Sequence, residues 1–186
     1  MSKIKGKVFA VSGSSGAGKT TIVNAVLELL PNFRKVKTYT TRPMRPNEVP
    51  GQDYHFLSLE QFEVHLKEGF FIESSQAYGN YYGCSKDSIK ETELGISLIY
   101  ILDYQGCLAL KRFYPETVGV WIDVDLNILR QRLEKRGEKK PTLERRLEIA
   151  KREKDLNKTD LFSFNVVNND LKKAVFEIKN ILEGAI

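Results

Sequence analysis

The stretch Val8-Phe9-Ala10-Val11-Ser12-Gly13-Ser14-Ser15-Gly16-Ala17-Gly18-Lys19-Thr20 is the strongest indicator of the fold class. Its first part is a short apolar run that predicts a buried strand, and residues 13–20 complete the pattern GxxxxGK(S/T). From Thr20 to Leu30 the apolar residues recur at helical spacing, and Pro31 ends the pattern. A strand, a glycine-rich turn and a helix in this order direct backbone N–H groups and a helix N-terminus at one anion-binding pocket.

The chemistry of this loop predicts that it binds the phosphates of ATP. Lys19 would reach the β- and γ-phosphates, and Thr20 would hold Mg²⁺ through its hydroxyl group. A Gly/Ser-rich turn without a ligand would explain the glycines, but not the Lys-Thr pair at the start of the helix. The residues predicted to contact ATP here are Ser14, Ser15, Gly16, Ala17, Gly18, Lys19, Thr20 and Thr21.

Length and composition indicate one globular domain that carries insertions. The chain has 186 residues, of which 41% are hydrophobic and 28% are charged. A net charge of +5, with 24 acidic residues interspersed among 29 basic ones, gives no continuous basic tract, and we expect no nucleic-acid partner. Cys84 and Cys107 are too few for a disulfide scaffold and suggest reduced thiols. No apolar run is long enough for a signal core or a membrane span, so we expect a cytoplasmic protein.

The rest of the chain alternates strands with helices. A near-continuous apolar run at 96–102 predicts a parallel strand buried on both faces, and the segments 117–124 and 164–167 are also predicted to be strands. Helices are predicted at 106–113, after an Asp125 N-cap, from about Thr142 and from Leu171. We therefore predict an α/β fold, with a parallel sheet that carries helices on both faces and binds ligands at the carboxyl ends of its strands.

The segment from 34 to 84 breaks this alternation and is predicted to be an insertion for a second substrate. Residues 34–57 are expected to be irregular with short strands. A helix with a capping box at Ser58–Gln61 and its end at Gly69, a strand at 70–72 and a turn-rich aromatic segment at Gly79–Gly83 are expected to follow. The segment contains the pattern TTRxxRxxExxGxDYxF over residues 40–56. Arg42 and Arg45 could bind a second phosphate bidentately, although arginines alone are more often solvated surface charges.

Four motifs together resemble those of guanylate kinases. They are the phosphate loop, the arginine-rich pattern, Gly79-Asn80-Tyr81-Tyr82-Gly83 and Asp103-Tyr104-Gln105-Gly106, in order from about Lys7 to the last helix. The resemblance implies transfer of the γ-phosphoryl group of ATP to GMP, with dGMP expected as well, giving ADP and GDP with Mg²⁺. It also implies a three-layer P-loop NTPase fold in three parts, with the oligomeric state left open. The parts are a core at about 1–36, 84–128 and 152–186, a GMP-binding insertion at about 37–83 and a lid at about 129–151.

The same resemblance implies roles for individual residues. Guanine offers an O6 acceptor and N1–H and N2–H donors, which suit a hydroxyl at position 38 and carboxylates at positions 73 and 103. Phosphoryl transfer requires alignment and positive charge, which lid arginines would supply together with Lys19. The implied residues are Thr38, Glu73 and Asp103 for guanine, Arg42, Arg45, Tyr54 and Tyr82 for the GMP phosphate, Lys19, Arg132, Arg136 and Arg146 for catalysis, and Asn168 near adenine.

Each implied residue also has an ordinary structural explanation. Thr38 could be a plain strand residue, Glu73 a surface acid, Asp103 a strand-end cap and Asn168 a turn residue. The chain departs from its relatives at Ile101, where they carry a second acid, and in the stiffer Thr38 where serine is common. Between Gly83 and Asp103 it is also one residue shorter than some relatives. Two other functions stay open: a P-loop kinase with a different phosphorylated acceptor, and a binding module that reuses the fold.

Overall fold

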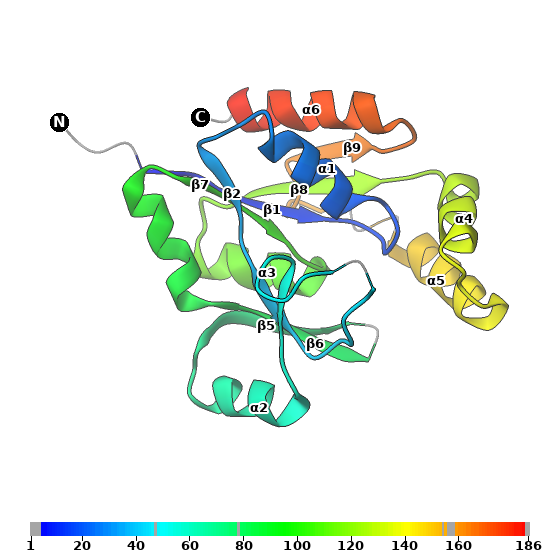
Figure 1. Cartoon of the computed structure of the whole chain (residues 1–186). Coiled ribbons are helices and arrows are strands. Elements are labelled where there is room, and N and C mark those ends of the chain that lie inside the picture. The colour runs from blue at the N-terminus through cyan, green and yellow to red at the C-terminus, as the bar shows by residue number, and fades with distance from the viewer. Residues whose placement is uncertain (1–4, 47, 78, 154, 156–158, 185–186) are drawn as a thin grey trace.

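Two β-sheets form the framework of the chain in the computed structural model (Figure 1), which describes residues 5–46, 48–77, 79–153, 155 and 159–184. The elements in chain order are β1 (Val8–Ser12), α1 (Lys19–Leu27), β2 (Phe33–Lys35), β3 (Thr38–Thr40), β4 (Tyr54–Phe56), α2 (Leu59–Lys67), β5 (Phe71–Ala77), β6 (Asn80–Ser85), the 3₁₀ helix η1 (Lys86–Leu94), β7 (Ser97–Ile101), α3 (Tyr104–Phe113), β8 (Val118–Asp123), α4 (Leu126–Lys135), α5 (Lys140–Glu153), β9 (Phe164–Val167) and α6 (Leu171–Gly184).

The larger sheet has the strand order β2-β7-β1-β8-β9, and all its pairs are parallel. β1 lies in the middle, and each of its residues is buried. Phe9 and Val11 belong to an apolar cluster with residues of α1, α4 and α6, whereas Val8 and Ala10 belong to a second cluster with residues of α3. This alternation confirms the predicted parallel sheet with helices on both faces, and Figure 1 shows α1 and α6 on one side and α3 on the other.

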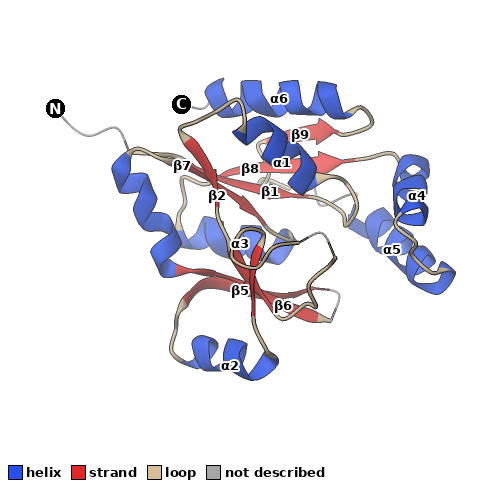
Figure 2. Ribbon diagram, viewed as in Figure 1, coloured by secondary structure: helices blue, strands red, loops and turns tan. Residues whose placement is uncertain are grey.

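The smaller sheet is mixed, with the strand order β4-β3-β6-β5 (Figure 2). β3 pairs with β4 in parallel and with β6 in antiparallel fashion, and β5 and β6 form an antiparallel hairpin around Gly79. The prediction of a turn-rich segment at Gly79–Gly83 was therefore mostly wrong, because residues from Asn80 onward extend as a strand. The predicted capping box at α2 is confirmed, with reciprocal bonds between Ser58 and Gln61.

The helix boundaries differ from the predicted ones by a few residues. α1 ends at Leu27 rather than at Leu30, and α3 begins at Tyr104, directly after its cap. α5 begins at Lys140, so that Pro141 occupies the first turn, where the missing N–H is tolerated. The predicted Asp125 cap is confirmed, since its side chain accepts from the N–H of Asn127 at 2.8 Å.

Two predictions from composition can also be compared with the fold. Cys84 and Cys107 are free and buried, which confirms that they form no disulfide. Within the described residues, no helix combines the length and the apolar character that a membrane crossing requires.

Candidate functional site

The loop between β1 and α1 has a backbone that only glycine adopts readily. Gly13, Gly16 and Gly18 have φ angles of 138°, 98° and 91°. Gly18 is also the left-handed N-cap of α1, and a Cβ atom there would collide with the side-chain amide of Asn168. The loop can therefore wrap closely around a ligand at the start of α1, as the sequence pattern predicts.

Lys19 folds back over this loop. Its Nζ donates to the backbone oxygens of Gly13 and of Ser14, the latter at 3.0 Å. Burial lowers the pKa of Lys19 to about 8, and the Glu153 carboxylate opposes this shift. A phosphate group is a much stronger acceptor than a neutral carbonyl, so the ammonium group is held at the loop with a weak partner that an anion can replace.

The other residues predicted to contact ATP lie along the same loop. Ser14 and Ala17 are buried, Ser15 and Gly16 are half-buried, and Thr20 and Thr21 are exposed in the first turn of α1. Asn168 is 2% exposed, and its Nδ2 donates to the backbone oxygen of Ala17 at 2.6 Å. The structure thus packs Asn168 directly on the loop, although it follows β9 some 150 residues along the chain.

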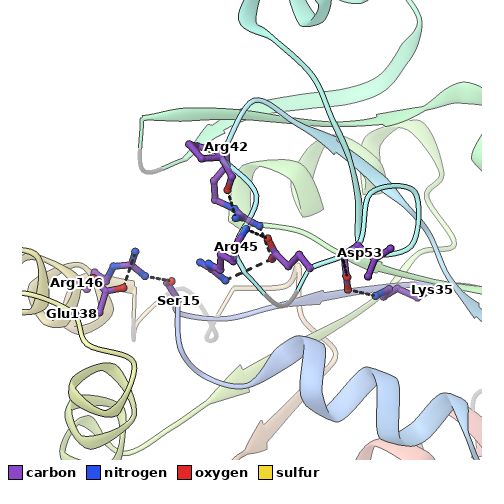
Figure 3. Close-up of polar contacts among 10 residues, drawn as sticks. Ser15, Lys35, Arg42, Arg45, Asp53, Glu138 and Arg146 are labelled. Atoms are coloured by element: carbon purple, nitrogen blue, oxygen red, sulfur yellow. Dashed lines mark hydrogen bonds and ion pairs between the residues drawn. The ribbon is translucent and has the colours of Figure 1, made fainter.

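Arginines from α4 and α5 also reach the loop. Arg132 donates to the backbone oxygens of Ala17 at 3.4 Å and of Asn168 at 2.9 Å. Arg146 donates to Ser15 Oγ at 2.9 Å and forms an ion pair with Glu138 at 3.2 Å (Figure 3). These contacts join the predicted lid to the phosphate loop.

The cations at this end of the molecule lie close enough to repel one another. Partial loss of solvation lowers the pKa of Arg136, and the charges of Arg45 and Arg146 lower it further. Burial lowers the pKa values of Arg132 and Lys19 most, and the charge of Arg136 lowers both further by a smaller amount. A group of mutually repelling cations is relieved by a polyanion, so the arrangement favours binding of several phosphates.

The smaller sheet has one face for packing and one face that carries the predicted GMP residues. On the packing face, Tyr39 stacks on His55 at 4.6 Å between ring centroids, and Phe62 of α2 stacks on Phe71 at 4.6 Å. Strict alternation would place Glu73 on the side of Phe71, but the register shifts between these two residues. The shift directs Glu73 to the opposite face. This second face carries Thr38, Tyr54, Glu73, Ser75, Tyr82 and Cys84.

Arg42 and Arg45 are gathered by one carboxylate (Figure 3). Arg42 forms an ion pair with Glu48 at 2.7 Å and lies over the rings of Tyr54 and Phe56 at 5.4 Å and 5.7 Å. Arg45 Nη1 is 4.0 Å from the same Glu48 oxygen, and its backbone N–H donates to the other one. The Arg42 side chain is therefore fixed, half-buried, beside Tyr54, whereas that of Arg45 is 55% exposed.

Glu73 and Asp103 converge at the start of α3. A Cβ atom on Gly106 would lie 2.9 Å from Glu73 Oε2 and 3.4 Å from Asp103 Oδ1, so only glycine leaves room for both carboxylates. Asp103 is indeed the cap of α3, since its Oδ1 accepts from the Gly106 N–H at 2.8 Å. Its Oδ2 accepts from Ser75 at 2.7 Å.

Glu73 lacks such partners. It is 4% exposed, and among the described residues no N–H or O–H group donates to either carboxylate oxygen. Burial raises the pKa of Glu73 to about 7; the Cys84 thiol opposes this rise, and the Asp103 carboxylate adds to it. A buried carboxylate without an N–H or O–H donor is costly for the fold, so the arrangement favours a ligand that brings such donors.

A small cavity is lined by residues of both predicted substrate regions. The lining residues are Thr20, Lys35, Val36, Thr38, Asp53, Tyr54 and Ile101. Thr20, which is predicted to bind the metal, thus shares a cavity with Thr38, which is predicted to contact guanine. The side chain of Ile101 in the same cavity is aliphatic. A larger cavity of about 500 Å³ lies between α4 and α5, but none of the predicted site residues lines it.

Three residues near the site were missed in the sequence. Glu48, which gathers the two arginines, stands in the arginine-rich pattern and could have been chosen from it. Ser75 and Glu153 carry no motif; they reach Asp103 and the neighbourhood of Lys19 only through the folded arrangement.

Comparisons with known proteins agree with this geometry. A family model described as guanylate kinase matches residues 5–185. The guanylate kinase of Thiobacillus denitrificans is 38% identical over 176 residues, which cover 93% of this chain and 83% of that protein. The guanylate kinase of Shewanella denitrificans is 35% identical over 181 residues, or 96% of this chain and 87% of that protein.

A solved structure extends the likeness to the fold. The crystal structure of guanylate kinase from Anaplasma phagocytophilum matches with a TM-score of 0.80 at 26% identity, covering 98% of this chain and 87% of that one. The α/β architecture of the P-loop NTPase type is thereby confirmed, and so is the resemblance drawn from the four motifs. The chain belongs to the guanylate kinase family.

Proposed function

We propose that the protein transfers the γ-phosphoryl group of ATP to GMP, giving ADP and GDP. One observation supports the proposal above all: two buried oxygens of Glu73, which accept from no N–H or O–H group of the described residues, stand on the same sheet face as Tyr54 and Tyr82. A guanine base offers two adjacent N–H donors to such a carboxylate, and adenine does not. Family membership supports the same reaction over an alternative acceptor or a binding module.

On the ATP side, the proposed work of the protein is electrostatic. Loop N–H groups and Lys19 would hold the β- and γ-phosphates, and Arg132, Arg136 and Arg146 would surround the transferring group. Little covalent chemistry is required of the protein, because alignment and charge stabilisation account for most of the rate in phosphoryl transfer. We nominate no general base.

Mg²⁺ fits this site as a mostly hydrated ion. Among the described residues no group of three or more His, Cys, Asp or Glu side chains could hold a metal, but the Thr20 hydroxyl is exposed in the first turn of α1. Mg²⁺ commonly keeps several waters and takes its other ligands from phosphate oxygens. When bound, it would neutralise charge on the β- and γ-phosphates. With Ile101 lining the cavity beside Thr20, no carboxylate at that position would orient its waters.

On the GMP side, the acceptor would be held at both ends. Arg42, Arg45, Tyr54 and Tyr82 would bind its phosphate, with Glu48 holding the two guanidinium groups in place. The Thr38 hydroxyl would donate to O6, while Glu73 and Asp103 would accept from N1–H and N2–H. None of the predicted GMP residues is assigned to the ribose, and dGMP is therefore an expected second acceptor.

The proposed division of labour follows the chain. The core sheet with the phosphate loop binds ATP, the insertion at about 37–83 binds GMP, and the lid at about 129–151 closes over the phosphates. Closure would exclude water, whose attack would hydrolyse ATP without transfer. Asn168 would contact the adenine side, and we expect the protein to act in the cytoplasm without a nucleic-acid partner.

A coupled assay of ADP release tests the proposal. The protein would be given ATP and Mg²⁺ with GMP, dGMP, AMP, CMP or UMP in separate reactions. Strong turnover confined to the guanine nucleotides is expected. Turnover with none of them, in folded protein that binds ATP, would point to another acceptor or to a binding role. Equal turnover with AMP would contradict the proposed reading of the base.

A further inference from the structure

Ser75 lies where the smaller sheet meets the core. It is on β5, two residues after Glu73 on the same face, and stands opposite Tyr82 in the ladder with β6. Its hydroxyl donates to Asp103 Oδ2 at 2.7 Å, across 28 residues of sequence. Ser75 therefore connects the strand that carries one proposed guanine acceptor with the carboxylate that forms the other.

The Asp103 carboxylate is held from two sides. Its Oδ1 accepts from the Gly106 N–H of α3, and its Oδ2 accepts from the hydroxyl on β5. The terminal torsion of an aspartate is broad in energy, so one helix-capping bond leaves the second oxygen free to swing. The bond from Ser75 removes this freedom.

The orientation matters because of what lies beside it. Glu73 Oε2 and Asp103 Oδ1 approach the same point next to Gly106, so a single planar base edge could meet both carboxylates. Discrimination by hydrogen bonds depends on acceptors that are already aligned, since a misaligned one gains little from the correct base. The two groups also interact electrostatically, since the Asp103 carboxylate adds to the rise in the pKa of Glu73.

We propose that Ser75 is a positioning residue of the guanine site, which acts by holding the Asp103 carboxylate in the plane that the base edge requires. This inference rests on the proposed function. Ser75 would not touch the reacting phosphate, so its effect belongs to acceptor affinity and base selectivity rather than to the transfer step.

Replacement of the hydroxyl tests the inference. In Ser75→Ala, the KM for GMP should rise about tenfold, because a hydrogen bond to a charged group is lost, while the KM for ATP and kcat change less than about twofold. Ser75→Thr keeps the donor and should restore the KM for GMP. Ser75→Cys keeps the shape with a weaker donor and should fall between these two variants. Ser74→Ala, on the exposed neighbour, is the matched control.

A double-mutant cycle separates positioning from a general structural effect. If Ser75 acts through Asp103, adding Ser75→Ala to Asp103→Asn should raise the KM for GMP much less than it does in the wild type. An unchanged KM in Ser75→Ala, an equal effect in both backgrounds, or a parallel loss for GMP and ATP with a lower Tm would overturn the inference. If the wild type itself fails to phosphorylate GMP, the proposed function fails and this inference fails with it.

Discussion

The phosphate loop and the proposed guanine site are built in opposite ways. At the loop, the charged side chains already have partners: Lys19 donates to two loop carbonyls, and Arg132 donates to the carbonyls of Ala17 and Asn168. At the guanine site, Glu73 is buried without an N–H or O–H donor among the described residues. These two cations of the loop are thus partnered before a ligand arrives and the Glu73 carboxylate is not, although Asn168 Oδ1 beside the loop also lacks a donor among the described residues.

The difference follows from the charge of the two ligands. Phosphates carry enough charge to displace neutral carbonyls from ammonium and guanidinium groups, so the loop can remain stable without them. A guanine base is neutral and cannot compete in this way. In the proposed site it would be recognised because a buried acceptor receives N–H donors only from the correct base, which penalises the wrong one. Strength and selectivity therefore come from different halves of the molecule.

The largest expected effect is at the loop. Lys19→Met should lower kcat by about 10²–10³-fold or more, because it removes a fixed positive charge beside the transferring group. Steady-state kinetics with GMP would measure it, and Lys67→Met, on the exposed end of α2, is the matched control. The melting temperature should stay near that of the wild type. Near-normal turnover would remove Lys19 from the proposed machinery.

The next effect should be selective for the base. Glu73→Gln replaces a carboxylate acceptor by an amide and should lower kcat/KM for GMP by about 10- to 100-fold, the range of a hydrogen bond to a charged group. AMP, which lacks the donor pair, should be used about as poorly as before. Parallel assays with both nucleotides decide the point, and an equal loss on both would mean that Glu73 supports the fold rather than reads the base.

The raised pKa of Glu73 should also make the free energy of unfolding depend on pH. Its pKa is about 7 in the fold against an ordinary value of 4.5, so between these values the folded protein binds a proton that the unfolded chain releases. The free energy of unfolding should therefore fall by about 3 kcal/mol as the pH rises through this window. Urea titrations of the wild type and Glu73→Gln from pH 4.5 to 8 would isolate the part of this pH dependence that Glu73 causes. Parallel pH curves for the two proteins would count against it.

The smallest effect is expected on the outer surface of the lid. Arg130 pairs with Glu144 at 2.8 Å, but both side chains are largely exposed, at 42% and 51%. Such an exposed pair contributes little to stability, and among the described residues Arg130 has no polar contact with the loop, so Arg130→Ala should change kcat by less than about twofold. Arg132→Ala, on the same helix but bonded to the loop, should lose far more. Comparable losses in the two variants would mean that lid charge in general, rather than contact with the loop, governs the rate.

More of the phosphate loop than of the smaller sheet could be predicted from the sequence, for a physical reason. The loop, β1 and α1 are contiguous, so periodicity and glycine placement were sufficient. In the smaller sheet, β3 pairs with strands on both sides that are distant in sequence, and the register shift between Phe71 and Glu73 decides which face Glu73 occupies. No local pattern encodes that shift. Glu48 could be read from its motif, whereas the bond from Ser75 to Asp103 exists only after folding.

A competition between two acceptors tests the central claim most directly. The wild-type protein would receive ATP, Mg²⁺ and equal amounts of GMP and isotope-labelled AMP, and the products would be quantified by mass. We expect GDP to accumulate in step with unlabelled ADP while labelled ADP stays near background. Labelled ADP in amounts comparable to GDP, or ADP formed with inorganic phosphate and no GDP, would contradict it.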